Sequence, residues 1–245
     1  MTHIDVSQIT TVLLAGGKGT RLRPLTAVFP KPLVPLGNKP IIEILLHRLA
    51  ASGFKNVTLC NGYLGELLMA VCGDGSKFGL SVSYVQEETP LGTAGPLSLV
   101  NDCSDPVLVM NGDLLTTMDF TKMLESHENR NAAVTIALFK RDVPIDFGVI
   151  DSDDDGTFQT YREKPVFHFE VSMGVYILSQ TAIQQVKKDE YLDMPDLILN
   201  VQRQGGLVNC YREDCFWLDI GRMDDYAKAQ DVYTSNEARF LGTSA

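Results

Sequence analysis

The sequence lacks an apolar run long enough to cross a lipid bilayer. Its longest apolar stretches, such as residues 11–15 and 41–46, fall well short of the roughly 20 residues that a transmembrane helix needs. The first ten residues hold one Asp and no basic segment followed by an apolar one, so we expect no signal peptide. These absences predict a cytoplasmic protein without a membrane partner.

Cysteine and positive charge are also scarce. The five cysteines include no Cys-x-x-Cys pair, and an odd number without metal-binding spacing indicates free thiols in a reducing compartment. Acidic residues outnumber basic ones by 31 to 21, a net charge of −10, so nucleic acid is not an expected partner. The hydrophobic share of 44% is ordinary for a folded protein, and 245 residues suffice for one large α/β domain or two small ones.

Short apolar runs alternate with segments of helical period over the first 139 residues. Strands are predicted at 11–15, 57–60, 80–85, 106–110 and 132–139, and helices at 41–52, 64–71, 93–100 and 120–127. Strands followed by helices in this rhythm form a largely parallel sheet that is covered on both faces. We therefore predict an α/β fold, a Rossmann-like three-layer domain with a mixed, mainly parallel central sheet.

After residue 139 the rhythm changes. Segments 147–150 and 157–161 flank the turn-rich residues 151–156 and predict an antiparallel hairpin, followed by strands at 171–178, 207–211 and 215–218 and helices at 192–204 and 224–233. No linker, composition shift or internal repeat divides the chain, so we expect one domain over residues 1–245. Because the last residues lack a strong period, we expect 236–245 to be a loose tail.

The most informative segment follows the first predicted strand and reads Leu-Leu-Ala-Gly-Gly-Lys-Gly-Thr-Arg-Leu-Arg-Pro-Leu-Thr over residues 13–26. Its glycines let backbone N–H groups approach phosphate oxygens closely. Lys31 lies between two prolines, which we expect to hold its backbone extended. Residues 6–42 contain no acidic residue and five basic ones: Lys18, Arg21, Arg23, Lys31 and Lys39. This local positive charge predicts a binding site for a polyphosphate.

Other phosphate and metal motifs do not fit. The glycine segment matches neither the P-loop nor the Gly-x-Gly-x-x-Gly pattern. Residues 151–156 begin like an EF-hand loop, but Arg162 stands where that loop needs a bidentate Glu, so a solvated hairpin turn is expected. The same residues contain an Asp-x-Asp, which would hold a metal in a glycosyltransferase if it followed a central strand. Here that place is taken by Asn-Gly-Asp at 111–113.

Two aspartates stand at the ends of apolar runs. Asp113 follows residues 107–110, and Asp219 follows residues 216–218. Ligands of α/β proteins bind at the carboxyl ends of the strands, so adjacent strands would bring both carboxylates to one edge of the sheet. A carboxylate directly after a buried central strand is typical of a metal ligand, which favours that role for Asp113. A cap or turn role is the plainer alternative for Asp113.

Taken together, these segments resemble the signature of sugar-1-phosphate nucleotidyltransferases, which include glucose-1-phosphate thymidylyltransferases and mannose- or heptose-1-phosphate guanylyltransferases. Further matches follow in the family's order: Pro-Leu-Gly-Thr-Ala-Gly at 90–95, Asn-Gly-Asp at 111–113, Glu-Lys-Pro at 163–165, Met-Gly-Val-Tyr at 173–176 and Trp-Leu-Asp-Ile-Gly at 217–221. The resemblance covers about residues 11–231. It implies the fold of nucleotide-diphospho-sugar transferases, with a nucleotide-binding half at about 10–130 and a sugar-phosphate-binding half at about 131–235.

The resemblance also implies an activity, the transfer of a nucleotidyl group from a nucleoside triphosphate to a sugar 1-phosphate with release of pyrophosphate. It implies catalytic roles for Arg21, Lys31, Asp113 and Lys164, and Mg²⁺ held by Asp113 and Asp219. Nucleotide-binding positions would be Leu14, Ala15, Gly16, Gly17, Gly19, Thr20, Gln86, Gly92 and Thr93. Sugar-phosphate-binding positions would be Asn111, Gly148, Glu163, Lys164 and Gly174. Since Lys164 precedes Pro165, its backbone too is expected to be extended.

The short form of the chain, ending soon after residue 231 without an added repeat domain, resembles hexose- or heptose-1-phosphate guanylyltransferases most. That resemblance implies GTP binding. A uridylyl- or thymidylyltransferase for a hexose 1-phosphate stays an alternative, as does a non-catalytic regulatory protein that binds nucleotide-sugars. The chain departs from many relatives at residues 171–174, where Val-Ser-Met-Gly replaces an Asn-containing stretch. A homo-oligomer is compatible with the sequence.

Overall fold

A seven-stranded sheet forms the centre of the protein, whose computed structural model describes residues 4–242. Its strand order is β12-β8-β11-β6-β1-β4-β5. The strands are β1 (Thr10–Ala15), β4 (Asn56–Asn61), β5 (Ser81–Gln86), β6 (Val107–Asn111), β8 (Val134–Pro144), β11 (Val166–Leu178) and β12 (Val208–Arg212). Within this sheet β11 runs antiparallel to β6 and β8, and the other four pairings are parallel. The predicted mixed, mainly parallel sheet is confirmed.

Alternate residues of the central strands serve two separate cores. In β1, Leu13 belongs to one core and Val12 to the other, and in β6 Leu108 and Val109 divide in the same way. This follows from the period of two along a strand. The first core packs against α1 (Ile41–Ala51), α2 (Gly65–Cys72) and α3 (Phe120–Arg130), and the second against α4 (Gln180–Ile183) and α5 (Met194–Arg203). The sheet is therefore covered on both faces.

Helix α3 shows how local sequence defines an element. Asp119 caps its start by accepting hydrogen bonds from the backbone N–H groups of Thr121 and Lys122. Asn131 ends it in the left-handed conformation, with φ of 48°. Its buried side chains recur at helical spacing and face the first core: Phe120, Met123, Leu124 and His127. Here the pattern and the cap agree, which is why the sequence predicts this helix correctly.

Three two-stranded sheets lie outside the central one, and two of them lie near the carboxyl ends of its strands. Strand β7 (Leu114–Thr116) pairs antiparallel with β13 (Trp217–Asp219), and β2 (Pro35–Leu36) pairs with β3 (Lys39–Pro40). The expectation that the strand of Asp219 lies beside that of Asp113 in the main sheet is therefore wrong. Instead β13 joins β7, the strand that directly follows Asp113, and the two aspartates still meet. A third core cluster around Ile220 and Tyr233 packs beneath this small sheet.

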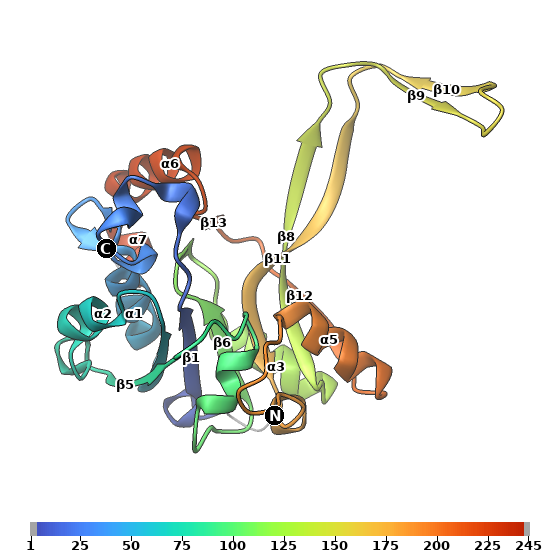
Figure 1. Cartoon of the computed structure of the whole chain (residues 1–245). Coiled ribbons are helices and arrows are strands. Elements are labelled where there is room, and N and C mark those ends of the chain that lie inside the picture. Colours follow the sequence, from blue (N-terminus) through green and yellow to red (C-terminus); the bar gives the residue numbers. More distant parts are fainter. Residues whose placement is uncertain (1–3, 243–245) are drawn as a thin grey trace.

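Strands β8 and β11 are longer than predicted and leave the sheet together. Their inner ends pair with β12 and β6, whereas from Phe139 and Val171 outward they pair only with each other. The ribbon ends in the predicted hairpin, formed by β9 (Val149–Ser152) and β10 (Phe158–Arg162). Figure 1 shows this ribbon, residues 139–171, projecting from the body of the molecule. We call it the arm.

The helices differ from the expected ones at residues 93–100, at the short helix α4 and at the end of the chain. Residues 93–100 contain only the 3-10 turn η6 (Gly95–Leu99), and short α4 was not predicted. The chain continues after α6 (Met223–Ser235) into α7 (Glu237–Leu241), whose Phe240 is fully buried against Phe216 and Tyr233. The expectation of a loose tail is thus wrong for residues 237–241, because one aromatic side chain anchors them; residues 243–245 lie outside the described residues.

Within residues 4–242, no helix is both long and apolar enough to span a bilayer.

Burial of His127 predicts how stability depends on pH. Its Nδ1 lies 2.9 Å from the Thr135 hydroxyl in the core, and burial lowers the pKa of His127 to about 4, against an opposing effect of Asp105. Because the unfolded chain takes up this proton near pH 6.5 and the folded chain only near pH 4, stability falls as pH decreases across that window. We expect a loss on the order of 2 kcal/mol from this group.

Chemical denaturation at several pH values checks this expectation. His127→Gln should flatten the decline between pH 6.5 and 4, whereas the control His168→Gln, at an exposed histidine of the arm, should keep it. Equal slopes for His127→Gln and the wild type would contradict it.

Candidate functional site

The site lies where β1 and β6 end side by side. The Gly112 N–H donates a hydrogen bond to the Leu14 carbonyl at 2.9 Å. A Cβ at residue 112 would lie 3.1 Å from that carbonyl oxygen, a tight contact, so the close approach favours glycine. This contact places Asp113 beside the glycine-rich segment that follows Ala15. The carboxyl ends of central strands thus come together, as predicted for ligand binding in an α/β sheet.

Lys31 links the two aspartates. Its ammonium forms an ion pair with Asp113 Oδ2 and lies 3.6 Å from Asp219 Oδ1. The backbone N–H of Ile220 also donates to the Asp113 carbonyl at 3.2 Å, which ties the end of β13 to this point. The structure therefore brings together three predicted residues that lie far apart in the sequence.

The predicted extended backbone of Lys31 is wrong. Lys31 opens the 3-10 turn η4 (Lys31–Leu33), in which the Leu33 N–H donates to the Pro30 carbonyl at 2.9 Å. Burial of Pro32 and Leu33 holds this turn against the body and overrides the local preference of a residue before proline. Packing of Pro32 and Leu33 against the body therefore fixes the position of the Lys31 ammonium.

The two carboxylates differ in environment. The Asp113 side chain is 19% exposed and that of Lys31 12%, whereas that of Asp219 is 45% exposed and faces the opening. Partial burial, followed by the charge of Asp113, raises the pKa of Asp219, although Lys31 and Arg21 act in the opposite direction. Asp113 is therefore neutralised by its ion pair with Lys31. The more exposed Asp219 is less favourable in its ionised form than an isolated carboxylate in water.

The residues present fit a divalent cation. Asp113 Oδ1 is buried and has no hydrogen-bond partner, so one oxygen in the site lacks the interaction that a buried carboxylate needs. Among residues 4–242, no three potential metal-ligating side chains are grouped, so the described part of the protein offers two carboxylates rather than a closed cage. Such a pair suits Mg²⁺, which commonly takes one or two carboxylates and completes its shell with phosphate oxygens and water.

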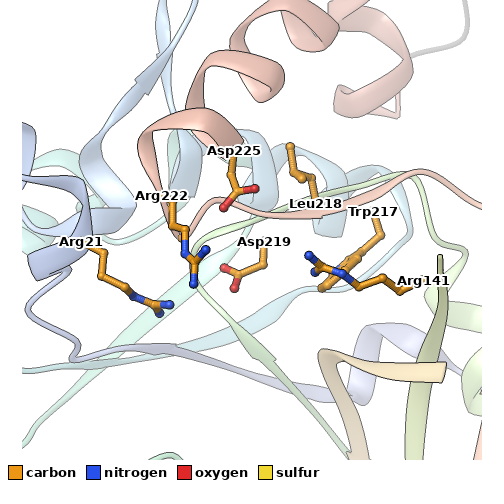
Figure 2. Close-up of a pocket in the computed structure, with 8 residues that line it drawn as sticks. Arg21, Arg141, Trp217, Leu218, Asp219, Arg222 and Asp225 are labelled. Carbon is orange, nitrogen blue, oxygen red and sulfur yellow. The ribbon is translucent and has the colours of Figure 1, made fainter. Parts of the chain in front are cut away.

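A pocket of about 230 Å³ opens beside Asp219. Figure 2 shows the guanidinium groups of Arg21 and Arg222 on one side of Asp219 and that of Arg141 on the other, next to Trp217. The remaining lining residues are Leu218, Gly221 and Asp225. Three guanidinium groups around one small pocket can bind an anionic group such as phosphate, which accepts paired hydrogen bonds from arginine.

Sequence reasoning missed Arg141, Arg222 and Asp225 in this pocket. Arg222 directly follows the Trp-Leu-Asp-Ile-Gly match, so its position next to that motif was an available signal. Arg141 lies at the base of the arm and reaches the pocket only because β8 extends beyond the sheet. No local pattern marks such a residue.

A second cavity of about 620 Å³ lies at the ends of β1, β4 and β5. Its lining contains three predicted nucleotide-binding residues, Gly16, Gly17 and Gln86. The other lining residues are Lys18, Gly62, Tyr63, Glu87, Glu88 and Pro90. The volume is in the range of pockets that hold small ligands.

Glu87 is an unpredicted acidic group in this cavity. Its Oε2 accepts a hydrogen bond from the Leu91 N–H at 3.0 Å, and a Cβ on Gly16 would lie 2.3 Å from Oε1. Burial raises the pKa of Glu87, while the Leu91 hydrogen bond opposes this rise. Gly16 therefore makes room for a carboxylate that has one oxygen held by the backbone.

Other predicted nucleotide-binding residues do not line the Gly16 cavity but hold the backbone turns next to it. Gly19 has φ of +58°, and a Cβ there would lie 3.0 Å from the Cβ of Lys31. The Thr26 hydroxyl donates to the Gly19 carbonyl at 2.7 Å, and the turn η2 (Thr20–Leu22) begins immediately after Gly19. This turn holds Arg21 at the first pocket. Leu14 and Ala15 contribute through β1 itself.

Gly92 and Thr93 do not line the described cavities. The Thr93 hydroxyl donates to Asp193 and accepts from the Met194 N–H at 2.7 Å. Gly92 has φ of +81°, and a Cβ there would lie 2.5 Å from the Leu192 carbonyl. Their contacts fasten the loop to the start of α5.

The structure separates the predicted sugar-phosphate residues into two groups. Asn111 and Gly174 meet in the body, where a Cβ on Gly174 would lie 2.5 Å from Asn111 Nδ2. The other three lie on the arm: Gly148, Glu163 and Lys164. The expected extended backbone of Lys164 is wrong, because its φ is +41° where the ribbon bends between β10 and β11.

Comparisons with known proteins agree with this arrangement. The profile of the nucleotidyl transferase family matches residues 10–236. A mannose-1-phosphate guanylyltransferase of Mycobacterium tuberculosis is 32% identical over 228 residues, which cover 90% of this chain and 63% of that protein. A UTP–glucose-1-phosphate uridylyltransferase of Synechocystis is 30% identical, covering 93% of this chain and 64% of that protein. The chain thus spans less than two thirds of these relatives.

Solved structures show the same fold. A putative glucose-1-phosphate thymidylyltransferase from Bacillus anthracis, in complex with a sucrose, superposes with a TM-score of 0.73 at 24% identity, over 91% of this chain and 94% of that one. HddC from Yersinia pseudotuberculosis complexed with GMP-PN gives a TM-score of 0.71 at 24% identity, over 92% and 99%. At this identity the likeness concerns the fold.

The raised pKa of Asp219 predicts a stabilising substitution. A carboxyl whose pKa is higher in the folded state weakens folding once it is ionised, so stability falls as pH rises above its ordinary value near 3.8. In metal-free protein, Asp219→Asn should raise the melting temperature at pH 7.5, by about 2–4 °C for each 1 kcal/mol gained. The gain should shrink as the pH is lowered and the wild-type carboxyl takes up a proton.

Melting curves between pH 5 and 8 measure this effect. Asp225→Asn removes a carboxylate from the same pocket wall and serves as the matched control. If Asp219→Asn were less stable than the wild type at every pH, Asp219 would be a structural residue.

Proposed function

The chain belongs to the nucleotidyl transferase family, and we propose that it joins a nucleoside triphosphate to a sugar 1-phosphate, giving a nucleotide-sugar and pyrophosphate. The observation that carries the proposal is the convergence of Lys31, Asp113 and Asp219 beside the arginine-lined pocket and near the cavity of Gly16 and Gln86. This arrangement offers one place for a base and another for phosphates. We also propose that the protein acts in the cytoplasm.

The proposed division of labour follows the chain. Residues of about 10–130 bind the nucleotide, and residues of about 131–235 bind the sugar phosphate, within one domain over 1–245. Gly16, Gly17 and Gln86 hold the base and ribose end, and Arg21, joined by Arg222 from the second half of the chain, binds phosphate oxygens. The separation of the Gly16 cavity from the arginine-lined pocket supports different places for the base and the phosphates.

In the proposed reaction an oxygen of the sugar phosphate attacks the α-phosphorus of the triphosphate. The new P–O bond forms as the bond from the α-phosphorus to the bridging oxygen breaks, and pyrophosphate leaves with that electron pair. The nucleophile is already an anion at neutral pH, so no general base has to remove a proton. The protein's task is alignment and neutralisation of charge.

The charged residues divide this task. Arg21 and Arg222 offset the charge that develops on the leaving pyrophosphate, and Lys31 keeps Asp113 and Asp219 close together. The two aspartates would hold Mg²⁺, for which the unpartnered Asp113 Oδ1 provides a ligand. When bound, Mg²⁺ supplies positive charge to the phosphate oxygens.

The nucleotide in this proposal is GTP. Guanine presents two neighbouring donors, N1–H and the N2 amino group, which match the two-acceptor edge of a carboxylate such as Glu87. Uracil and thymine present one donor between two carbonyl acceptors, which a carboxylate repels. Glu87 lies in the proposed base cavity beside Gly16 and Gln86, and this supports guanine over a pyrimidine.

A substrate matrix tests the function. Purified protein with Mg²⁺ is assayed for pyrophosphate release with four nucleoside triphosphates against hexose and heptose 1-phosphates. Arg21→Ala should lower kcat/KM at least tenfold, since a hydrogen bond to a charged group contributes about 1.5–3 kcal/mol. The control Arg203→Ala removes an exposed arginine of α5 that lines neither the arginine pocket nor the Gly16 cavity and should retain wild-type rates. Release of no pyrophosphate from any pair, together with nucleotide-sugar binding, would favour the regulatory alternative.

Glu87→Gln tests the base. Loss of the carboxylate should lower kcat/KM for GTP about tenfold, because a charge-assisted hydrogen bond is replaced by a weaker one, and should change the rates with UTP or dTTP little or raise them. Glu88→Gln, at the neighbouring lining position, is the matched control. Equal effects of Glu87→Gln on every triphosphate would show that Glu87 does not read the base.

A further inference from the structure

The arm has two open edges. Its strands pair with each other from Val166 with Pro144 to Val171 with Phe139, and neither pairs there with another strand of residues 4–242. A two-stranded ribbon by itself is marginally stable in water, and open strand edges are ready to pair or pack with another chain. The arm as it stands in one copy therefore lacks a cover.

Large apolar side chains are exposed along this ribbon. Phe147 is 78% exposed, and five others are between 48% and 60% exposed: Ile150, Phe158, Tyr161, Val166 and Phe169. Apolar side chains gathered on a projecting element mark an interaction surface. The arm is thus built to be covered by protein.

Nothing in the described part of the chain holds the outer arm to the body. Residues 145–165 make all their described hydrogen bonds and ion pairs within the arm, as between Tyr161 and Glu163 or Arg162 and Asp151. The base, in contrast, is clamped, because Arg212 donates to Glu170 at 2.6 Å and Trp217 packs against Phe139 with ring centroids 5.1 Å apart. These contacts direct the ribbon away from its own body.

This direction separates residues that the proposed reaction needs together. Glu163 and Lys164 lie beside the outer hairpin, whereas Lys31, Asp113 and Asp219 lie in the body. Figure 1 shows β9 and β10 at the far end of the arm, away from β13. One copy therefore presents a phosphate site without the lysine expected to position the sugar phosphate.

The body offers a surface that matches the arm in polarity and charge. Val28 is 64% and Phe29 51% exposed in the loop after the glycine-rich segment, and Tyr63 adjoins that loop through a hydrogen bond to the Ala27 carbonyl. Lys18 and Arg23 are exposed in the same basic segment. Residues 142–163 of the arm carry seven acidic side chains and one basic one, so the charges of the two surfaces are opposite.

We propose that the arm of one copy docks on this surface of a second copy and delivers Lys164 and Glu163 to the second copy's phosphate site. The exchange is mutual, so the active species is a twofold dimer in which each site combines the body of one chain with the arm of the other. Docking covers exposed apolar side chains of the ribbon and completes the site. The delivery of Lys164 rests on the proposed function, whereas the docking itself does not.

Complementation between two inactive variants tests the shared site. Asp113→Asn disables the body, and Lys164→Ala disables the arm. In a mixed dimer, the body of the Lys164→Ala chain receives an intact arm from the Asp113→Asn chain. Random mixing makes half of the dimers mixed with one intact site each, so activity should return to about one quarter of the wild-type level. A mixture no more active than the separate variants would overturn the proposal.

Cross-linking tests the docking without any assay of activity. A chain in which the accessible cysteines Cys103, Cys210 and Cys215 are replaced by serine, and which carries Lys164→Cys together with Val28→Cys, is treated with a short bismaleimide and separated on a denaturing gel. The expected product is a covalent dimer, absent from either single variant, and dilution should not remove it. A product cross-linked only within one chain, or wild-type protein that sediments as a monomer at assay concentration, would refute docking.

The two measurements separate the two proposals. Covalent dimers in a protein that releases no pyrophosphate with any substrate pair would retain docking and reject the proposed function. An active enzyme that stays monomeric would retain the proposed function and reject docking. Phe147→Asp combined with Phe158→Asp, which places charges among the exposed apolar side chains of the arm, should turn the wild-type dimer into a monomer; a dimer of unchanged stability would show that these side chains are not the contact.

Discussion

Two carboxylates that meet in a partly buried site need positive charge between them, and in this protein Lys31 provides it. The ammonium pairs with Asp113 inside the site and lies near Asp219 at the opening. Removing charges from water is costly unless partners are close, so this cluster constrains the positions of η4, which carries Lys31, and of β13, which carries Asp219. The same cluster leaves Asp113 Oδ1 without a partner, which keeps one ligand free for a cation.

Glycines and short turns make this arrangement possible. Gly112 lets β6 approach the Leu14 carbonyl, and Gly19 lets the next turn fold over Lys31, because a Cβ at either place would crowd its neighbour. The small sheet of β7 and β13 then brings Asp219 to Asp113 from more than a hundred residues away in the chain. Local backbone freedom and one long-range strand pairing together determine the chemistry that the site can perform.

The fold was largely readable from the sequence. The Asp119 cap and the helical spacing of apolar residues from Phe120 to His127 predict helix α3. Uninterrupted apolar runs predict the buried strands β1 and β6. The expected loose tail failed for residues 237–241, where burial of the single side chain Phe240 anchors the segment. A lone aromatic residue has no period, so only tertiary packing reveals its role.

For the site, the sequence alone determined the residue types: a basic, glycine-rich segment free of acids, and aspartates that end apolar runs. These follow from local chemistry, which any stretch of chain carries with it. Tertiary structure decided which of them meet. It paired β13, the strand of Asp219, with β7 rather than with the main sheet, brought Arg141 to the arginine-lined pocket, and placed Lys164 on the projecting arm. Such placements depend on contacts between distant segments, and neither spacing nor composition encodes those contacts locally.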